Sequence, residues 1–139
     1  MRTPRGSAAG QATVEFSLAV LVFLTILAGM FDLGRAVYTY NGVAEAAREI
    51  ARVTSVHPGT TLGTSSETLA VIGSQQGLVP GLEAPTFTCV DIDGSVISGT
   101  CAPGKWVKVV VSAPYQPATP LIGLAGPFTL ESSSRVQIP

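Results

Sequence analysis

Charge is scarce in this sequence, and the scarcity excludes a class of function. Only 12% of the 139 residues are charged, against about a quarter in an ordinary soluble domain. Lysine occurs only at Lys105 and Lys108, and the formal net charge is −1. Proteins that bind nucleic acids gather lysine and arginine in patches, because phosphate contacts supply much of the affinity. We therefore expect no nucleic-acid partner.

Catalytic motifs and ligand sets are also lacking. The single histidine, His57, stands beside Pro58 without a nucleophile motif around it. The sequence contains no G-x-S-x-G, no H-E-x-x-H and no glycine-rich phosphate loop. The carboxylates are few and dispersed, without an obvious acid/base couple. These absences predict a protein that is not an enzyme and that holds no metal or cofactor.

Hydrophobic residues, in contrast, make up 46% of the chain, and one long apolar run stands out. The run from Phe16 to Phe31 would measure about 24 Å as a helix, short of a bilayer core of about 30 Å. Residues 12–31 reach spanning length, but only with Glu15 included. Arg2 and Arg5 precede the run and the larger part follows it, which predicts a single pass with the C-terminus outside the cytoplasmic membrane.

Three interpretations of this segment compete. It can be a plain membrane anchor with Glu15 at the interface. It can be a secretory signal cleaved after the apolar run, near Ala28-Gly29. It can also be a prepilin-type signal, cut before the run between Gly10 and Gln11 so that the apolar helix stays as a stem.

The residues favour the prepilin interpretation, because it gives Glu15 a use. After such a cut Gln11 carries a free amine and Glu15 becomes the fifth residue, followed by Phe16. A carboxylate in hydrocarbon costs several kcal/mol unless it is paired. The Gln11 amine of a neighbouring subunit can neutralise it, so we predict that Glu15 and Phe16 set the register of assembly. Gly10, without a Cβ, suits a tight protease subsite.

The residues after the run extend this pattern into a resemblance. Asp32-Leu33-Gly34-Arg35 is followed by Tyr38, Tyr40 and Asn41, and then by A-A-R-x-x-A-R at residues 46–52. With G-x-x-x-x-E-F and the apolar stem, residues 10–53 resemble the TadE-like family, the minor pilins or pseudopilins of tight-adherence (Flp-type) pili. The resemblance covers about a third of the chain.

The resemblance implies a structural subunit rather than an enzyme. It implies processing by a prepilin peptidase, contact with other pilin subunits through the N-terminal helix, and contact with the inner-membrane pilus assembly machinery. The subunit would leave the cytoplasmic membrane for a surface pilus or its initiating tip, in support of adhesion and biofilm formation. The alternative from another class is a single-span, membrane-anchored extracytoplasmic binding module.

Beyond the membrane the helical pattern continues to about Val56, where Pro58 ends it. Its apolar stripe comprises Val37, Tyr40, Val43, Ala44, Ala47, Ile50 and Ala51. On the other side we expect the ion pairs Glu45–Arg48 and Glu49–Arg52, and at the membrane boundary an exposed pair of Asp32 with Arg35. The glycines at 29, 34 and 42 indicate either close packing or, at 29–34, a weak point where the stem bends or melts.

The rest of the chain predicts a small β domain with one short helix. Thr64 and Glu67 can form a capping box for a helix over residues 65–76, with Leu69, Ile72 and Val71 as its buried face. Strands are expected at 86–92 and 95–98 around the Asp93-Gly94 turn, at 105–113, and between 128 and 138. The prolines at 114–127 predict an extended loop that holds Leu121, Ile122 and Leu124.

Cys89 and Cys101 flank the Asp93-Gly94 turn, and outside the cytoplasm a disulfide is the default for such a pair. A metal site would need two more ligands.

Asp91 to Gly94 is similar to the start of a calcium loop. Thr100, however, occupies the position of the acidic residue that would close such a loop, so a turn is favoured.

Together these features predict an α+β protein with a long N-terminal pilin-type helix and a small antiparallel β domain packed against it. We expect a cleaved leader at residues 1–10, the stem at 11–56 with its membrane-spanning part at about 12–31, a linker with a short helix at 57–84, and a β-rich extracytoplasmic domain at 85–139.

Overall fold

The computed structural model describes residues 6–119, 123 and 126–139, with side chains from Gly10 onward. Helix α1 (Gly6–Val56) is followed by helix α2 (Ser66–Leu78) and by strands β1 (Thr86–Val90), β2 (Trp106–Tyr115) and β3 (Phe128–Gln137). This order confirms the predicted α+β class. Half of the expected leader (residues 1–5) and the three apolar residues expected in the loop (Leu121, Ile122 and Leu124) lie outside the described residues.

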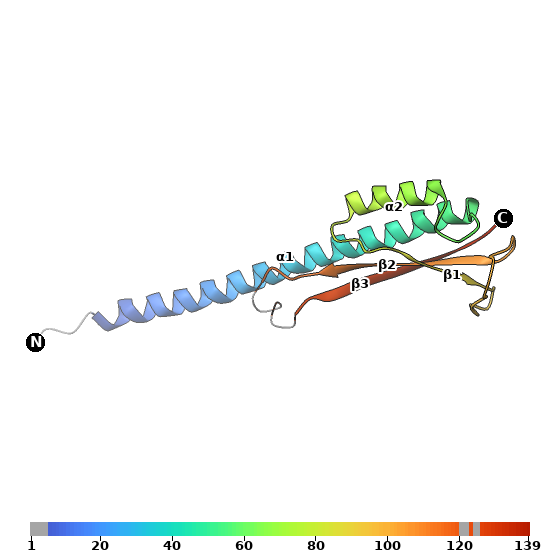
Figure 1. Ribbon diagram of the computed structural model, residues 1–139. Helices are drawn as coiled ribbons and strands as arrows, with labels where there is room; N and C mark the ends of the chain where they lie inside the picture. Colours follow the sequence, from blue (N-terminus) through green and yellow to red (C-terminus); the bar gives the residue numbers. More distant parts are fainter. Residues whose placement is uncertain (1–5, 120–122, 124–125) are drawn as a thin grey trace, which may run out of the picture.

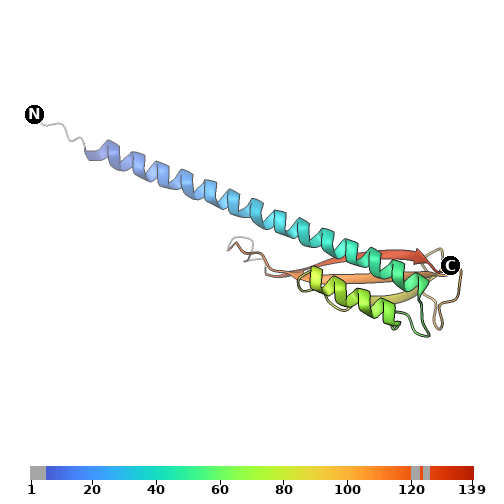
Figure 2. The same cartoon turned by 90° about the horizontal axis from the view of Figure 1, so that it is seen from above.

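Helix α1 dominates the shape of the molecule. At 1.5 Å per residue its 51 residues span about 77 Å. The N-terminal half projects alone, while α2 and the sheet lie beside the C-terminal half, as both views show (Figures 1 and 2). The helix ends at Val56, where the sequence predicted its end. The projecting half is therefore free to meet a membrane or other subunits.

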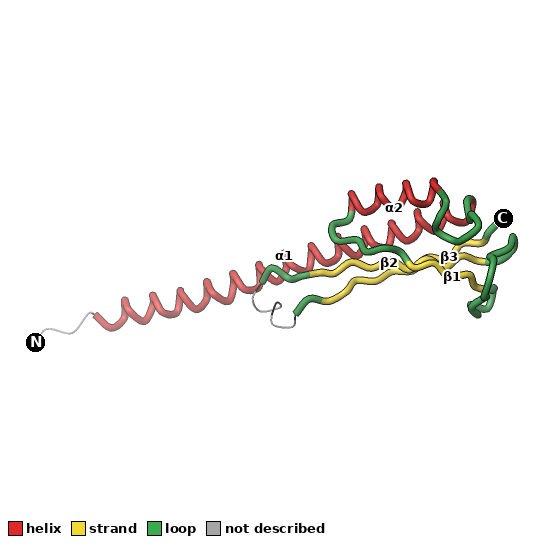
Figure 3. Tube along the Cα trace, in the orientation of Figure 1, coloured by secondary structure: helices red, strands yellow, loops and turns green. Residues whose placement is uncertain are grey.

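The three strands form one antiparallel sheet in the order β1-β2-β3, which runs along α1 (Figure 3). Successive side chains of β2 point to opposite faces of the sheet. The side chains turned toward α1 are buried, and they are Val107, Val109, Val111, Ala113 and Tyr115. The alternate residues from Trp106 to Pro114 face away from α1. A three-stranded sheet gains its stability from such a covering helix.

The core joins α1 to this inner face. Alanines give α1 a flat surface that lets the sheet approach, and the fully buried α1 residues are Val43, Ala46, Ala47, Ile50, Ala51 and Thr54. The predicted stripe is confirmed for Val43, Ala47, Ile50 and Ala51, whereas Ala44 is only partly buried. It is wrong for Val37 and Tyr40, which are about half exposed. The contact line instead passes through Asp32, Ala36 and Thr39, one helical position away from them.

Helix α2 differs from its prediction in its cap and its buried face. The N-cap is Ser65, whose Oγ accepts a hydrogen bond from the Thr68 amide at 3.2 Å, so the Thr64–Glu67 capping box is wrong. The inward positions are Thr68, Val71 and Ile72, whereas Leu69 is 56% exposed. Thr68 is fully buried within hydrogen-bonding distance of Thr54, so a polar residue that the apolar pattern could not identify fixes the helix.

The strand predicted at residues 95–98 is also wrong. Asp93 and Gly94 form the expected turn, but only one isolated bridge, Val90 to Val96, follows it. The Ile97 amide donates to the Cys89 carbonyl, and the chain then leaves the edge of β1 to bring Cys101 back to Cys89. The disulfide therefore competes with the extension of the hairpin.

Candidate processing and assembly site

The projecting part of α1 is apolar and exposed. By length and composition α1 can cross a membrane. In residues 12–31 most side chains are exposed, and none is buried against the rest of the described chain. Twenty residues of helix measure about 30 Å, the thickness of a bilayer core. No side chain of this segment is therefore packed into the folded part of the described chain, which is consistent with membrane anchoring.

The residues predicted for processing and register lie at the start of this segment. Gly10, Gln11, Val14, Glu15 and Leu18 share one face of α1. Gln11 and Glu15 are one helical turn apart on that face. Phe16 lies beside Glu15 and is 70% exposed. This face is polar at Gln11 and Glu15 and apolar from Leu18 onward. A second helix packed against it would contact both the carboxylate of Glu15 and the side chain of Leu18.

The bond expected to be cut lies inside regular helix. Helix α1 begins at Gly6 and continues through Gly10 and Gln11 without interruption. Glycine in a helix costs about 1 kcal/mol relative to alanine, and the first turn of any helix lacks part of its hydrogen bonds. Gly10 and the nearby start of the helix therefore lower the cost of the local unwinding that access by a protease requires.

Asp32 marks the other end of the apolar segment, and its role corrects the sequence prediction. Asp32 is 2% exposed rather than the exposed half of an ion pair. Its carboxylate accepts hydrogen bonds from the backbone amides of Ala118 and Thr119, both at 2.9 Å, and from the Thr119 hydroxyl. Arg35 Nη1 lies 3.8 Å from Asp32 Oδ1 and is a weaker partner. The end of the apolar segment is therefore pinned to the loop after β2.

Tyr115 completes this attachment, which we call the Asp32 clamp (Asp32, Tyr115, Ala118 and Thr119). The Tyr115 hydroxyl donates to the Asp32 carbonyl at 2.7 Å, and the Arg35 guanidinium lies over the Tyr115 ring. The Thr119 hydroxyl and the Ala118 amide lower the pKa of Asp32. The partners of Asp32 lie more than 80 residues further along the chain. The only indication of this attachment in the sequence was therefore an acidic residue directly after an apolar run.

The three stem glycines differ in their surroundings. A Cβ at Gly42 would lie 3.0 Å from Val79 Cγ2, so this glycine permits close contact between α1 and the segment after α2. A Cβ at Gly29 or Gly34 would meet nothing within 4 Å. Close packing therefore explains Gly42 alone, and α1 remains helical through the other two.

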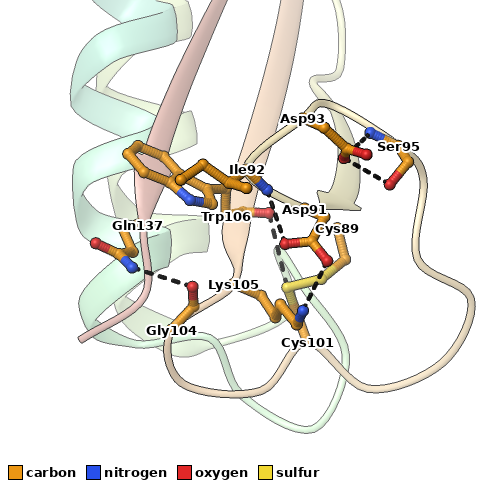
Figure 4. A network of polar contacts seen from close by, with 10 residues as sticks. All are labelled: Cys89, Asp91, Ile92, Asp93, Ser95, Cys101, Gly104, Lys105, Trp106 and Gln137. Atoms are coloured by element: carbon orange, nitrogen blue, oxygen red, sulfur yellow. Dashed lines mark hydrogen bonds and ion pairs between the residues drawn. A yellow bond between two sulfur atoms is a disulfide. The ribbon is translucent and has the colours of Figure 1, made fainter.

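The far end of the domain holds the disulfide and a small polar network (Figure 4). Cys89 and Cys101 are bonded, with their Cα atoms 5.6 Å apart, as predicted. Lys105 Nζ donates to Asp91 Oδ2 at 2.8 Å, and Asp93 Oδ1 accepts from the amide and hydroxyl of Ser95. Lys105 and the Ile92 amide lower the pKa of Asp91. Both carboxylates thus organise the turn.

The predicted stem pairs are formed. Arg48 contacts Glu45 at 2.9 Å, and Arg52 contacts Glu49 through two hydrogen bonds. The Arg52 guanidinium lowers the pKa of Glu49. These pairs lie on the side of α1 opposite its buried stripe and are largely exposed, so their contribution to stability is small.

Comparison with known proteins bears on the N-terminal third of the chain. Residues 10–52 match the family model described as TadE-like protein. No curated protein and no solved structure matches the chain. The matched segment begins at Gly10, includes the apolar run and the Asp32 position, and ends at Arg52. It confirms the resemblance to the TadE-like family over residues 10–52.

Proposed function

We propose that the chain is a minor pilin or pseudopilin of a Tad/Flp-type pilus. The observation that carries the proposal is the division of α1 at Asp32. In residues 12–31 the helix is largely apolar and none of its side chains is buried in the described chain, whereas after Asp32 the helix forms part of the core of a folded domain. A subunit that enters a membrane and then a filament needs both parts on one helix.

Processing is the first step of the proposed function. A prepilin peptidase would cut between Gly10 and Gln11, which removes Arg2 and Arg5 and leaves Gln11 with a free amine. The helix must open locally for this cut, and its position in the first turns, with glycine at the bond, keeps the cost low. The apolar helix is retained, unlike that of a secretory signal.

Assembly is the second step. The carboxylate of Glu15 in one subunit would pair with the Gln11 amine of the next. Four residues of helix separate the two positions, so the paired subunits would be offset by about 6 Å along the stem. The pair would remove the cost of a charge in an apolar surrounding. Phe16 and the residues after it would supply the apolar contact between stems.

The Asp32 clamp supports this arrangement from the domain side. It holds the loop after β2 against the stem at the end of the apolar segment. The folded domain therefore begins where the proposed span ends, about 30 Å from residue 12. We infer a single-pass topology with the domain outside, and a surface location after assembly by the inner-membrane pilus machinery, in support of adhesion and biofilm formation.

A substitution of Glu15 tests the register role. Glu15→Ala should insert into the membrane like the wild type but enter sheared surface filaments at a small fraction of the wild-type level. Glu45→Gln is the matched control, because it removes an exposed stem carboxylate far from the proposed contact. Quantitative immunoblots of membrane and filament fractions give both numbers. Equal filament levels for Glu15→Ala and the wild type would contradict the proposed pairing.

A further inference from the structure

The sheet face turned away from α1 carries a recess that the proposed function does not use. The recess measures about 260 Å³ and is lined by Val90, Gly94, Lys108, Ser133 and Arg135. Lys108, Ser133 and Arg135 are exposed, and the turn containing Gly94 lies over the sheet beside them. This face remains open when the stem packs against other helices.

Two like charges stand opposite each other in this recess. Lys108 and Arg135 are directly paired across β2 and β3. Like charges at such positions destabilise a sheet. In the part of the chain that the structure describes, neither forms an ion pair with a carboxylate, whereas neighbouring Lys105 is paired with Asp91. No carboxylate of the described residues therefore offsets the repulsion between Lys108 and Arg135, and an external anion would do so.

The nearby carboxylates do not neutralise the pair. Asp91 accepts from Lys105 and from the Ile92 amide, and Asp93 is engaged with Ser95. Both belong to the turn that borders the recess. The next acidic groups on the same face are Glu83, which accepts a hydrogen bond from the Ser112 hydroxyl, and Glu131, which is paired with Ser112. Ser112 lies four residues along β2 from Lys108, or about 13 Å away.

Arg135 is held in place before any ligand arrives. Its guanidinium lies over the ring of Trp106, 5.1 Å from the ring centroid. On the turn side, a Cβ at Gly94 would lie 3.7 Å from Arg135 Nη1, so the turn lies beside the guanidinium. A guanidinium fixed in this way presents its donors as a planar fork, the geometry that suits carboxylate and phosphate oxygens.

From this geometry we propose that the recess is a binding site for an oxyanion, a carboxylate or a phosphate group. Arg135 supplies the directional hydrogen bonds, Lys108 the second charge, and Ser133 lies at the wall. Two sources can deliver the group: a free anion in the medium, or the carboxylate of Glu131 from another copy of the chain. In both cases the bound oxyanion attracts Lys108 and Arg135 and so offsets the repulsion between them.

Equilibrium dialysis of the full chain in a non-ionic detergent, with radiolabelled phosphate as the probe, tests the site directly. The ionic strength is held constant with sodium chloride. The wild type should take up phosphate saturably, and Lys108→Ala should bind it at least ten-fold more weakly, because one charge-assisted contact is lost. Lys108→Ala leaves the Arg135–Trp106 contact intact, and Lys108 is exposed, so the fold is retained.

The control Arg48→Ala removes an exposed cation of α1 and should leave phosphate binding unchanged. Trp106 is the single tryptophan of the chain, so its fluorescence reports whether the ligand lies beside Arg135. Equal phosphate uptake by the wild type and by Lys108→Ala would overturn the site.

The variant Glu131→Gln separates the two sources. If the oxyanion comes from another copy, the wild type should bind phosphate less well as protein concentration rises, and Glu131→Gln should remove that dependence. If it is a free anion, Glu131→Gln should bind phosphate like the wild type at every protein concentration. The absence of both saturable phosphate uptake and any effect of Glu131→Gln would overturn the proposal.

Discussion

Asp32 attaches the stem to the sheet through a side chain that an apolar helix would otherwise exclude. Its carboxylate is almost fully buried, and three donors from residues 118 and 119 converge on it. A buried carboxylate persists only when it is paired or hydrogen-bonded. The sequence showed the acidic residue but not its partners, which a loop more than 80 residues away supplies.

The clamp should make stability depend on pH in a defined direction. The Thr119 hydroxyl and the Ala118 amide hold the pKa of Asp32 below its unfolded value of about 3.9. The stabilisation is therefore complete above that value and is lost as the pH falls through the lower, folded-state pKa. Asp32→Asn should lower the melting temperature at pH 7, and its gap to the wild type should shrink below about pH 4.

Thermal unfolding followed by circular dichroism in non-ionic detergent at pH 7, 5 and 3 measures this gap. Glu45→Gln is the control, because an exposed ion pair contributes at most about 1 kcal/mol. A gap between Asp32→Asn and the wild type that stays constant over this range would show that ionisation of Asp32 does not stabilise the fold.

Gly63 and Gly104 offer a matched test of packing at single residues. Both have positive φ, at +84° and +85°, a conformation that disfavours any side chain. A Cβ at Gly63 would overlap the Phe87 ring, whereas one at Gly104 would meet nothing within 4 Å. Gly63→Ala should therefore cost about 1–3 kcal/mol more in the free energy of unfolding than Gly104→Ala. Chemical denaturation of both variants measures the difference, and equal values would mean that Phe87 moves freely aside.

At the scale of elements, the helix and the strand with a strong hydrophobic period could be predicted from the sequence. The features that depend on a choice between neighbouring interactions could not. The end of α1 at Val56 and the strand through residues 106–113 follow from Pro58 and from alternating valines. The α2 cap moved by one residue because Ser65, not Thr64, reaches the Thr68 amide. Leu69 lies outside the core, because the buried position next to it is occupied by Thr68. The strand at 95–98 was lost because Cys101 must return to Cys89.

In the candidate site, the residues of the local motif were predictable, whereas the contacts between distant elements were not. Gly10, Gln11, Glu15 and Phe16 were identified from a local motif, and their roles remain predictions. The Asp32 clamp and the Lys108–Arg135 recess arise from contacts between elements. Neither has a signature within a short window of sequence.

The disulfide is the element-scale feature with the largest expected effect. Cys89 and Cys101 close a loop across 12 positions, which in the chain-entropy model is worth about 3 kcal/mol. Replacing both with serine should lower the free energy of unfolding by about this amount. Reduction of the wild type should give the same loss, which serves as the control. If neither treatment changes the denaturation midpoint, the bond does not stabilise the domain.

At the scale of the whole molecule, one helix serves two environments. Its first part carries the apolar segment and the processing motif, and its second part carries the buried face of a small α+β domain. The clamp at Asp32 joins the two parts at the end of the proposed span. The account therefore depends on what happens at the start of α1, where the leader would be removed and the stem kept.

The mature N-terminus tests this central claim most directly. The chain should be extracted from membranes of cells with and without a prepilin peptidase, and its N-terminus identified by sequencing and intact mass. The account predicts Gln11 as the first residue when the peptidase is present and Met1 when it is absent. Gly10→Leu should keep Met1 in both. An intact Met1 in cells that contain the peptidase would contradict the account and indicate a plain membrane anchor.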